Sequence, residues 1–412
     1  MMSELLGLIY TGNNTDQLRE LTATRAVAAV PICARYRVID FILSSLVSSG
    51  ARNVGVITQK NYHSLMDHLG SGKEWDLHGK RQGLVILPPF LTHDNVGVYK
   101  GLLDAIRSNL HFLRRSKERY VLVTDTGMLY TARFDDMLMQ HIQTNADITL
   151  MYSDDHTMLR TGGNGCYLKV DGAGRVLDME LEPMLPNYEN SYMQAFVIRR
   201  ELLIELADRA LARAQYHFTR DVLTSGLRDG TLKIYGWRNP GCVWRLDSVL
   251  DYYNCSMALL KPEVQAELFS ADRPIWTKVR DEMPTRYFAA AQVKNSLLGD
   301  GCVIEGTVEN SILSRGVRVQ KGAVVRNAVI MQDSYIMSGA HVECCILDKQ
   351  VIVREGSTLT APATYPLVVA KDTIEEKIIE LQALKRSLSS IIRVADEEGS
   401  SLTQEDIAYL LS

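Results

Sequence analysis

The sequence predicts an α/β domain with a largely parallel sheet, followed by a left-handed parallel β-helix and a helical tail. Two patterns carry this prediction. Short apolar runs alternate with amphipathic stretches in the first part of the chain, and a six-residue repeat dominates a later part. We therefore expect an α/β domain at 1–255, a helical connector at 256–286, a β-helix at 287–370 and a helical tail at 371–412.

The apolar runs of the first segment have the length of buried strands. They read LLGLIY, NVGVIT, GLVILP, YVLVTD and ADITLMYS, and helix-like segments such as FILSSLVSSG lie between them. This alternation is typical of a largely parallel sheet that is covered by helices. Such sheets bind ligands at the carboxyl ends of their strands, so the segment from Ile9 to Pro31 is the expected site.

The later repeat is clearest in the stretch GVRVQKGAVVRNAVIMQDSYIMSG. Val317, Ala323, Val329 and Tyr335 follow one another at intervals of six, as do several neighbouring aliphatic residues. A six-residue period predicts a left-handed β-helix in which each face of a triangular coil is one hexapeptide. An ordinary antiparallel sheet would show a period of two with frequent turn signals. At about 18 residues per coil, four to five coils are expected.

The last segment predicts a helical tail. Apolar residues fall at spacings of three and four from Ile374 to Ile391, and Thr403 with Asp406 resembles a capping box for a second helix.

Composition narrows the class of protein further. The chain has 412 residues and a formal net charge of -4, with acidic and basic residues interspersed. This charge pattern provides no basic stripe that would bind nucleic acid. No apolar run in the sequence reaches the roughly 18 residues that a membrane span needs. Seven cysteines without a C-x-x-C pair predict reduced thiols and no structural metal. We expect a cytoplasmic protein that binds neither nucleic acid nor membranes.

Several stretches resemble one enzyme family. RAVAAVP, YRVIDFILSSLVSSG, VGVITQ, GSGKEWDL and VILPPF, ahead of a hexapeptide domain, resemble ADP-glucose pyrophosphorylase, the glucose-1-phosphate adenylyltransferase of glycogen and starch synthesis. The resemblance covers about 1–370 and implies a nucleotidyltransferase domain with a Rossmann-like sheet. In that reaction glucose 1-phosphate attacks the α-phosphate of ATP and releases pyrophosphate, which requires cations and a metal held by carboxylates.

The resemblance also implies that the phosphate-binding groups have been replaced. The family loop G-G-x-G-x-R-L aligns with Gly12 to Leu18, which leaves Gly12 as the remaining glycine and puts Gln17 in place of the arginine. The lysine of the family motif R-A-K-P-A-V-P falls on Val27. In the E-K-P motif that holds the sugar phosphate, Glu182 replaces the lysine.

The two metal-binding aspartates are replaced as well. One aligns with Gly127, and Asp125 lies two residues earlier; the other aligns with Leu246, and Asp247 follows it. We therefore expect no catalytic residues, no metal and no cofactor. The residues that remain around the expected nucleotide or sugar-phosphate pocket are Gly12, Arg25, Gln59, Asp125 and Asp247.

Five charged groups that the family reaction requires are thus replaced, at Gln17, Val27, Gly127, Glu182 and Leu246. These replacements favour a non-catalytic or weakly catalytic regulatory subunit of bacterial glycogen biosynthesis. Such a subunit would assemble with an active homologous adenylyltransferase subunit, in a hetero-oligomer such as a mixed tetramer, through its hexapeptide domain. One alternative is an active nucleotidyltransferase that uses Asp125 and Asp247 as displaced ligands of Mg²⁺. Another is a free-standing sensor of a sugar phosphate or nucleotide.

Overall fold

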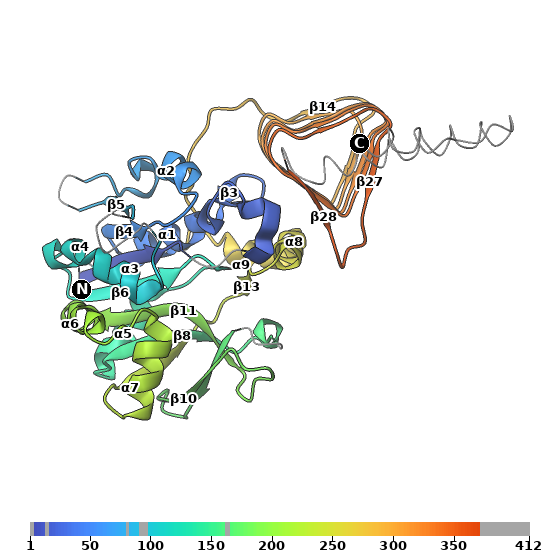
Figure 1. Cartoon of the computed structure of the whole chain (residues 1–412). Coiled ribbons are helices and arrows are strands. Elements are labelled where there is room, and N and C mark those ends of the chain that lie inside the picture. The colour runs from blue at the N-terminus through green and yellow to red at the C-terminus, as the bar shows by residue number, and fades with distance from the viewer. Residues whose placement is uncertain (1–3, 13–15, 80–81, 90–97, 161–164, 371–412) are drawn as a thin grey trace, which may run out of the picture.

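The computed structural model describes residues 4–12, 16–79, 82–89, 98–160 and 165–370. Within them an α/β domain is followed by a triangular β-helix that lies against its side (Figure 1). The helical tail that the sequence predicts at 371–412 lies outside the described residues. None of the helices in the described ranges combines the length and apolar character that crossing a bilayer requires.

A nine-stranded mixed sheet forms the centre of the α/β domain. Its strands are β1 (Leu5–Tyr10), β4 (Asn53–Ile57), β5 (Leu84–Leu87), β6 (Tyr120–Asp125), β8 (Ile148–Ser153), β9 (Cys166–Val170), β10 (Val176–Leu181), β11 (Asn190–Arg199) and β12 (Ile234–Arg238). The order along its main path is β10-β9-β11-β6-β1-β4-β5, and β8 pairs with β11 and β12. The neighbours β6, β1, β4 and β5 are parallel, as expected, whereas β11 runs antiparallel to β6 and β8.

Helices cover both faces of this sheet. They are α1 (Val38–Ser48), α2 (His63–Leu69), α3 (Leu102–Ser108), α4 (Leu110–Arg115), α5 (Phe134–Gln143), α6 (Arg200–Leu211) and α7 (Thr224–Arg228), with a π-helical turn η6 (Phe218–Leu223). The side chains of β1 alternate between the two layers: Leu5 and Ile9 share a core with α1, while Leu6 and Leu8 share one with α3. Burial on both faces explains why β1 is an unbroken apolar run.

Short elements surround the carboxyl ends of the parallel strands. They are the 3-10 turns η2 (Asp16–Thr22), η3 (Val27–Ala29) and η5 (His156–Met158), the hairpin β2 (Pro31–Ile32) with β3 (Tyr36–Arg37), and the pair β7 (Met128–Tyr130) with β13 (Val243–Arg245). The turn η4 (Lys73–Trp75) lies instead near the amino ends of β4 and β5, where Asp76 pairs with Arg52. η2 and η3 belong to the segment in which the sequence predicts the site.

The connector is helical over only part of its predicted length. The helices α8 (Val249–Ala258) and α9 (Pro262–Leu268) are followed by a stretch without helix as far as Thr285. Pro274 and Pro284 in this stretch lack the backbone N–H that a helix needs. The prediction of helix over 256–286 is therefore wrong beyond Leu268.

The β-helix consists of five coils whose strands form three five-stranded parallel sheets. The first face contains β14 (Arg286–Tyr287), β17 (Val303–Ile304), β20 (Arg318–Val319), β23 (Tyr335–Ile336) and β26 (Ile352–Val353). The second contains β15 (Gln292–Lys294), β18 (Thr307–Glu309), β21 (Val324–Arg326), β24 (His341–Glu343) and β27 (Thr358–Thr360). The third contains β16 (Leu297–Leu298), β19 (Ile312–Leu313), β22 (Val329–Ile330), β25 (Cys345–Leu347) and β28 (Leu367–Val369).

Most coils are one residue shorter than three hexapeptides. Equivalent residues such as Glu309 and Arg326 lie 17 apart in the chain. At one corner the stacked residues Asn295, Asn310, Asn327 and Cys344 all have positive φ, which allows a tighter turn and which asparagine tolerates better than most residues. Because the coils are shorter than 18 residues, side chains that are six apart in the sequence do not all point into the β-helix. Val317 and Ala323 are interior, whereas Tyr335 points outward and is 36% exposed.

The third face of the β-helix packs against the α/β domain. Its outward side chains Ile312, Val329, Ile346 and Val368 belong to one buried cluster with residues of η2, η3, α1, α8 and α9. The hydroxyl of Tyr253 in α8 donates to the carbonyl oxygen of Asn327 at 2.7 Å. Burial of a large aliphatic side chain contributes about 1.5–3 kcal/mol, so these four residues hold the two domains together firmly.

Two polar contacts accompany this apolar cluster. Arg25 donates from Nη1 and Nη2 to the two carboxylate oxygens of Asp348, each at 2.7 Å, and both side chains are at most 9% exposed. Residues 361–366 of the last coil extend toward η2, where Nη1 of Arg19 donates to the hydroxyl of Tyr365 at 2.6 Å. The buried pair is the stronger constraint because neither charge has access to water as a substitute partner.

We expect Arg25→Met to lower the free energy of unfolding by about 3–5 kcal/mol, because it leaves the carboxylate of Asp348 buried without its partner. Replacing both residues, as Arg25→Met with Asp348→Leu, should cost less than either single change. Denaturant unfolding of the three variants measures this. A double variant that is as unstable as the sum of the two singles would contradict the assignment of this pair as a coupled unit.

Candidate functional site

A cleft of about 710 Å³ lies at the carboxyl ends of β1 and β4. It brings together three residues of the predicted pocket, Gly12, Arg25 and Gln59. Its described lining includes no carboxylate and contains the cations Arg19, Arg25, Lys60 and Lys100. This is the place where an open α/β sheet binds its ligand, and its charge suits an anionic group.

The floor of this cleft is occupied by a tyrosine. The hydroxyl of Tyr10 donates to the carbonyl oxygen of Gly12 at 3.2 Å and lies 3.3 Å from Oε1 of Gln59. Burial, with smaller contributions from Asp125 and Asp104, raises the pKa of Tyr10 to about 12, so the phenol is a donor at neutral pH. A Cβ atom on Gly12 would collide with Tyr10 and Gln59. The side chain of Tyr10 therefore fills the space beside the one remaining glycine of the loop.

The two positions where the family places metal-binding aspartates are adjacent in space. The N–H of Leu246 donates to the carbonyl oxygen of Gly127 at 2.8 Å, at the end of the β7–β13 pair. Leu246 is 2% exposed and belongs to the apolar cluster that joins the two domains. Asp125, at the end of β6, accepts the N–H of Gly127 at 3.1 Å. The two family positions themselves thus supply no carboxylate, and the carboxylate that contacts them is that of Asp125.

Asp125 and Asp247, the displaced aspartates of the active-enzyme alternative, have different surroundings in the described part of the chain. Asp247 is 45% exposed in its side chain and pairs with Arg245 at 3.4 Å. It lines a second cleft of about 620 Å³ together with Gln17, whereas Asp125 lines neither cleft. In the described ranges no group of three or more His, Cys, Asp and Glu side chains could hold a metal ion.

The remaining replaced positions have different environments. Gln17 is exposed at the start of η2, and Glu182 is exposed with a positive φ at the end of β10. Val27 is 3% exposed in η3 and packs in the cluster that contacts the β-helix. Two of the former charged positions, Val27 and Leu246, have thus become part of the core between the domains.

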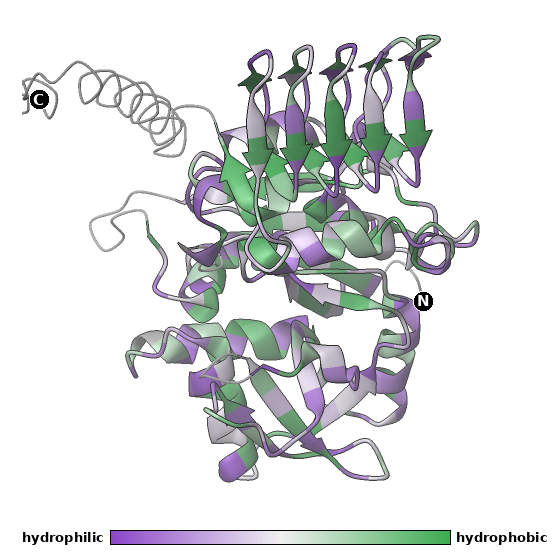
Figure 2. Ribbon diagram, turned by 90° about the vertical axis from the view of Figure 1, so that its right-hand side faces the viewer, coloured by the Kyte–Doolittle hydropathy of each residue, from purple (hydrophilic) through white to green (hydrophobic). Residues whose placement is uncertain are grey.

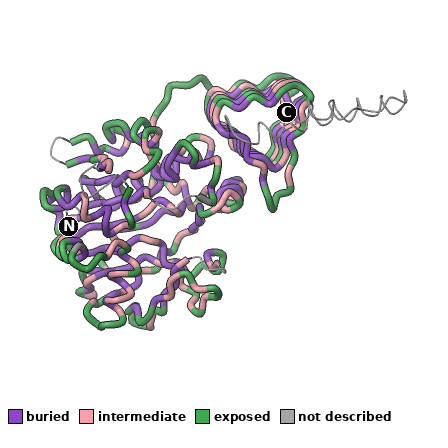
Figure 3. Tube along the Cα trace, viewed as in Figure 1, coloured by how far each residue is buried: buried purple, intermediate pink, exposed green. Residues whose placement is uncertain are grey.

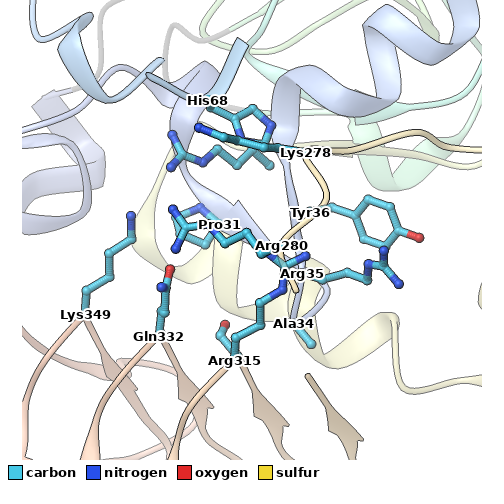
Figure 4. A pocket seen from close by; sticks show the side chains of 12 residues that line it. Pro31, Ala34, Arg35, Tyr36, His68, Lys278, Arg280, Arg315, Gln332 and Lys349 are labelled. Atoms are coloured by element: carbon cyan, nitrogen blue, oxygen red, sulfur yellow. The ribbon is translucent and has the colours of Figure 1, made fainter. Parts of the chain in front are cut away.

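A third, smaller cavity of about 40 Å³ lies between the two domains and is strongly basic. It is roughly large enough for a few water molecules or one phosphate group. Figure 4 shows cationic side chains converging on it from both domains. The cations come from the β2–β3 hairpin, the linker after α9 and one corner of the β-helix in two of its coils: Arg35, Arg37, Lys278, Arg280, Arg315 and Lys349. No carboxylate lines it in the described part of the chain.

Burial and the mutual repulsion of these cations lower the pKa values of two of them. Burial, followed by the charges of Arg37 and Arg25, lowers the pKa of Lys349 to about 8. Burial and the neighbouring Arg35 and Arg280 also lower the pKa of Arg315, whose Nε is buried without a hydrogen-bond partner. An anion in this cavity would offset the repulsion and satisfy that nitrogen.

Sequence reasoning did not find this basic cavity. Its arginines and lysines lie in four separate parts of the chain, from Arg35 to Lys349, and each part alone resembles an ordinary charged surface. The local signals are two pairs of cations at a spacing of two, Arg35 with Arg37 and Lys278 with Arg280.

Comparison with known proteins agrees with this architecture. Residues 6–241 match the family model described as nucleotidyl transferase, and residues 283–362 match the GlmU-like C-terminal hexapeptide. The chain is 31% identical over 380 residues to the glycogen biosynthesis protein GlgD of Bacillus subtilis, covering 92% of this chain and 98% of that protein. It is 37% identical over 358 residues to the glucose-1-phosphate adenylyltransferase of Thermomicrobium roseum, covering 85% and 82%. A GlgD of Geobacillus stearothermophilus is 34% identical over 329 residues, covering 79% and 84%.

The chain therefore belongs to the nucleotidyl transferase family and carries the hexapeptide domain of its GlmU-like members. Within that family its relatives are glucose-1-phosphate adenylyltransferases and GlgD proteins, as the sequence motifs predict.

We expect Val27→Lys and Leu246→Asp each to lower the free energy of unfolding by about 3–5 kcal/mol, because each buries an uncompensated charge in the interdomain cluster. Gln17→Arg is the matched control: it also restores a family cation, but at an exposed position, and should change stability by less than about 0.5 kcal/mol. Thermal or denaturant unfolding measures the difference. Equal stability of all three variants would show that Val27 and Leu246 are not structural.

Proposed function

We propose that this protein is a non-catalytic or weakly catalytic regulatory subunit of a glucose-1-phosphate adenylyltransferase in glycogen biosynthesis. The observation that carries the proposal is the replacement of the metal-binding pair by Gly127 and a buried Leu246. Without carboxylates at these positions the chain lacks the groups with which the family holds a metal on the reacting triphosphate. The exposed Gln17 and the buried Val27 remove two further cations from the same region.

The relatives support this assignment in two ways. Some are named as the adenylyltransferase itself and others as the glycogen biosynthesis protein GlgD, so similar sequences carry either name. We infer that the chain works in the cytoplasm beside an active homologous subunit and assembles with it into a hetero-oligomer such as a mixed tetramer.

The basic cavity provides the regulatory element of the proposal. It is lined by both domains, so an anion bound there would contact Arg37 of the α/β domain and Arg315 of the β-helix together. A ligand that bridges two domains changes how they sit relative to each other, or how firmly they are held. We infer that a small phosphorylated metabolite or inorganic anion acts as effector at this cavity.

A second function is favoured by the first cleft. Its cations and its volume of about 710 Å³ leave room for a sugar phosphate or a nucleotide that is bound but not converted. In that case the chain would act as a sensor of substrate. The active-enzyme alternative has less support, because Asp247 lines the second cleft and Asp125 lines neither of the two clefts described above.

We expect the purified chain to make no measurable ADP-glucose from ATP, glucose 1-phosphate and Mg²⁺. Removing a single preorganised electrostatic partner commonly lowers the rate by about 100- to 1000-fold, and several are absent here. An active adenylyltransferase, assayed in parallel, is the positive control. Turnover above background that disappears in Asp125→Ala would overturn the non-catalytic assignment.

We expect inorganic phosphate to bind the basic cavity at neutral pH, and Arg315→Gln to weaken this binding about tenfold or more, since it removes a buried charged donor. The matched control is Arg318→Gln, because Arg318 is exposed on the first face of the β-helix and stacks on Tyr335. Titration calorimetry measures both. Equal affinity of the two variants would place the phosphate elsewhere.

The same binding should depend on pH through Lys349. Its pKa of about 8 means that the amine is charged at neutral pH and neutral at higher pH. The contribution of Lys349 to phosphate affinity, measured as the difference between the unchanged chain and Lys349→Met, should therefore fall as pH rises from 7 to 9. The charged groups that act on this amine are Arg25, Arg37 and Arg280, which lower its pKa, and Asp348, which raises it. Lys349→Met should weaken binding at pH 7 and flatten the profile. A profile that is unchanged in Lys349→Met would contradict this assignment.

A further inference from the structure

An arm of the β-helix, residues 361–366, reaches the α/β domain beside the first cleft. The arm connects β27 to β28 in the last coil, at a corner where the first coil uses only residues 295–296. The coils stand in a row beside the α/β domain, with the last coil at one end (Figure 2). Its corner between β27 and β28 projects beyond the outline of the other coils (Figure 1), and Figure 3 shows this projection as exposed.

The arm is a short turn between two prolines. The N–H of Tyr365 donates to the carbonyl oxygen of Pro362 at 2.9 Å. Pro362 and Pro366 each fix one backbone dihedral, which makes the turn stiff. Pro366 is buried, and Val368 after it belongs to the cluster that joins the two domains. The side chain of Tyr365, which is 62% exposed, is therefore presented from a fixed base.

Tyr365 contacts a cation of the first cleft. Nη1 of Arg19 donates to the hydroxyl of Tyr365 at 2.6 Å, and the guanidinium carbon lies 5.6 Å from the centre of its ring. Arg19 also lines the first cleft. An exposed arginine loses rotamer freedom when it binds a ligand, and this loss weakens binding. A side chain that is already held by Tyr365 has lost part of that freedom beforehand.

The backbone of Arg19 also depends on its surroundings. Its dihedral angles, φ 45° and ψ −119°, interrupt η2. This conformation favours glycine, and a residue with a side chain keeps it where neighbouring contacts hold it. Leu18 and Leu21 anchor the apolar side of η2 in the cluster between the domains. The arm holds the opposite, exposed side through Tyr365.

We propose that Tyr365 is a positioning residue that holds Arg19 at the first cleft, so that the β-helix sets the affinity of this cleft for an anionic ligand. The inference rests on the second function proposed above, in which the cleft binds a sugar phosphate or a nucleotide without converting it. Beside Arg19 the described lining contains the cations Arg25, Lys60 and Lys100 and no carboxylate. A preorganised Arg19 adds its charge to theirs with less loss of entropy.

The first test needs no ligand. We expect Tyr365→Phe, which removes the hydroxyl and keeps the ring, to speed amide hydrogen exchange about threefold or more within residues 18–23, because η2 loses its contact on the exposed side. Mass spectrometry of the full chain measures this exchange. The matched control is Tyr335→Phe: Tyr335 is also exposed and has Arg318 over its ring at 5.2 Å, but it lies on the first face of the β-helix. Thermal unfolding should be the same in both variants.

The second test measures the affinity of the full chain for ATP and for glucose 1-phosphate, each alone, by titration calorimetry. We expect Tyr365→Phe to weaken binding about three- to tenfold, the range of one hydrogen bond. Arg19→Gln should weaken it at least as much. In the Arg19→Gln background Tyr365→Phe should have no further effect, because it acts through Arg19.

Unchanged exchange within residues 18–23 of Tyr365→Phe would overturn the proposal, as would an equal increase in Tyr335→Phe. Ligand binding that is unaffected by Tyr365→Phe, or weakened equally with and without Arg19, would overturn it as well. If the unchanged chain binds neither ATP nor glucose 1-phosphate, the second function fails and the ligand part of this proposal fails with it. The exchange comparison then still decides whether Tyr365 positions Arg19.

Discussion

The packing of the third face of the β-helix against η2, η3 and α8 is the constraint on which the rest of the structure depends. It fixes two elements of the former phosphate-binding segment against a rigid solenoid, through Ile312, Val329, Ile346 and Val368. The bidentate pair of Arg25 and Asp348 adds a directional contact that apolar packing alone lacks. The neighbouring Lys349 lines the basic cavity, so the interface and the candidate effector site share one corner of the β-helix.

This interface also explains why some of the replaced family positions now carry apolar residues and others carry polar ones. Val27 and Leu246 lie inside the cluster, where apolar side chains contribute to stability, whereas Gln17 and Glu182 remain exposed and contribute little. Positions that face a core are free to take up a structural role once chemistry no longer requires a charge. Positions that face solvent gain no such role and keep polar residues.

Much of the fold follows from the sequence because its signals are local. The runs that form β1, β4, β5 and β6 are apolar on both faces, and the hexapeptide period defines the solenoid. The antiparallel β11 and the tight corner at Asn310 and Asn327 have no such signal, since each depends on a partner strand or a stacked coil. The site is less predictable still. The loss of the metal-binding pair can be recognised from aligned motifs, but Tyr10 beside Gly12 and the converging cations of the basic cavity depend on tertiary contacts between distant segments.

The corners of the β-helix have a consequence for how such domains tolerate insertions. Strands on the flat faces must keep their length, because one extra residue would turn every following side chain to the wrong side. At the corners the backbone can take up or release residues: equivalent asparagines are 15 apart between the first two coils and most other coils repeat at 17. The last coil carries the extra segment 361–366 at a corner and still stacks in register. Corners are therefore the points at which a solenoid of this kind acquires an arm that reaches a neighbouring domain, as Tyr365 does when it receives a hydrogen bond from Arg19.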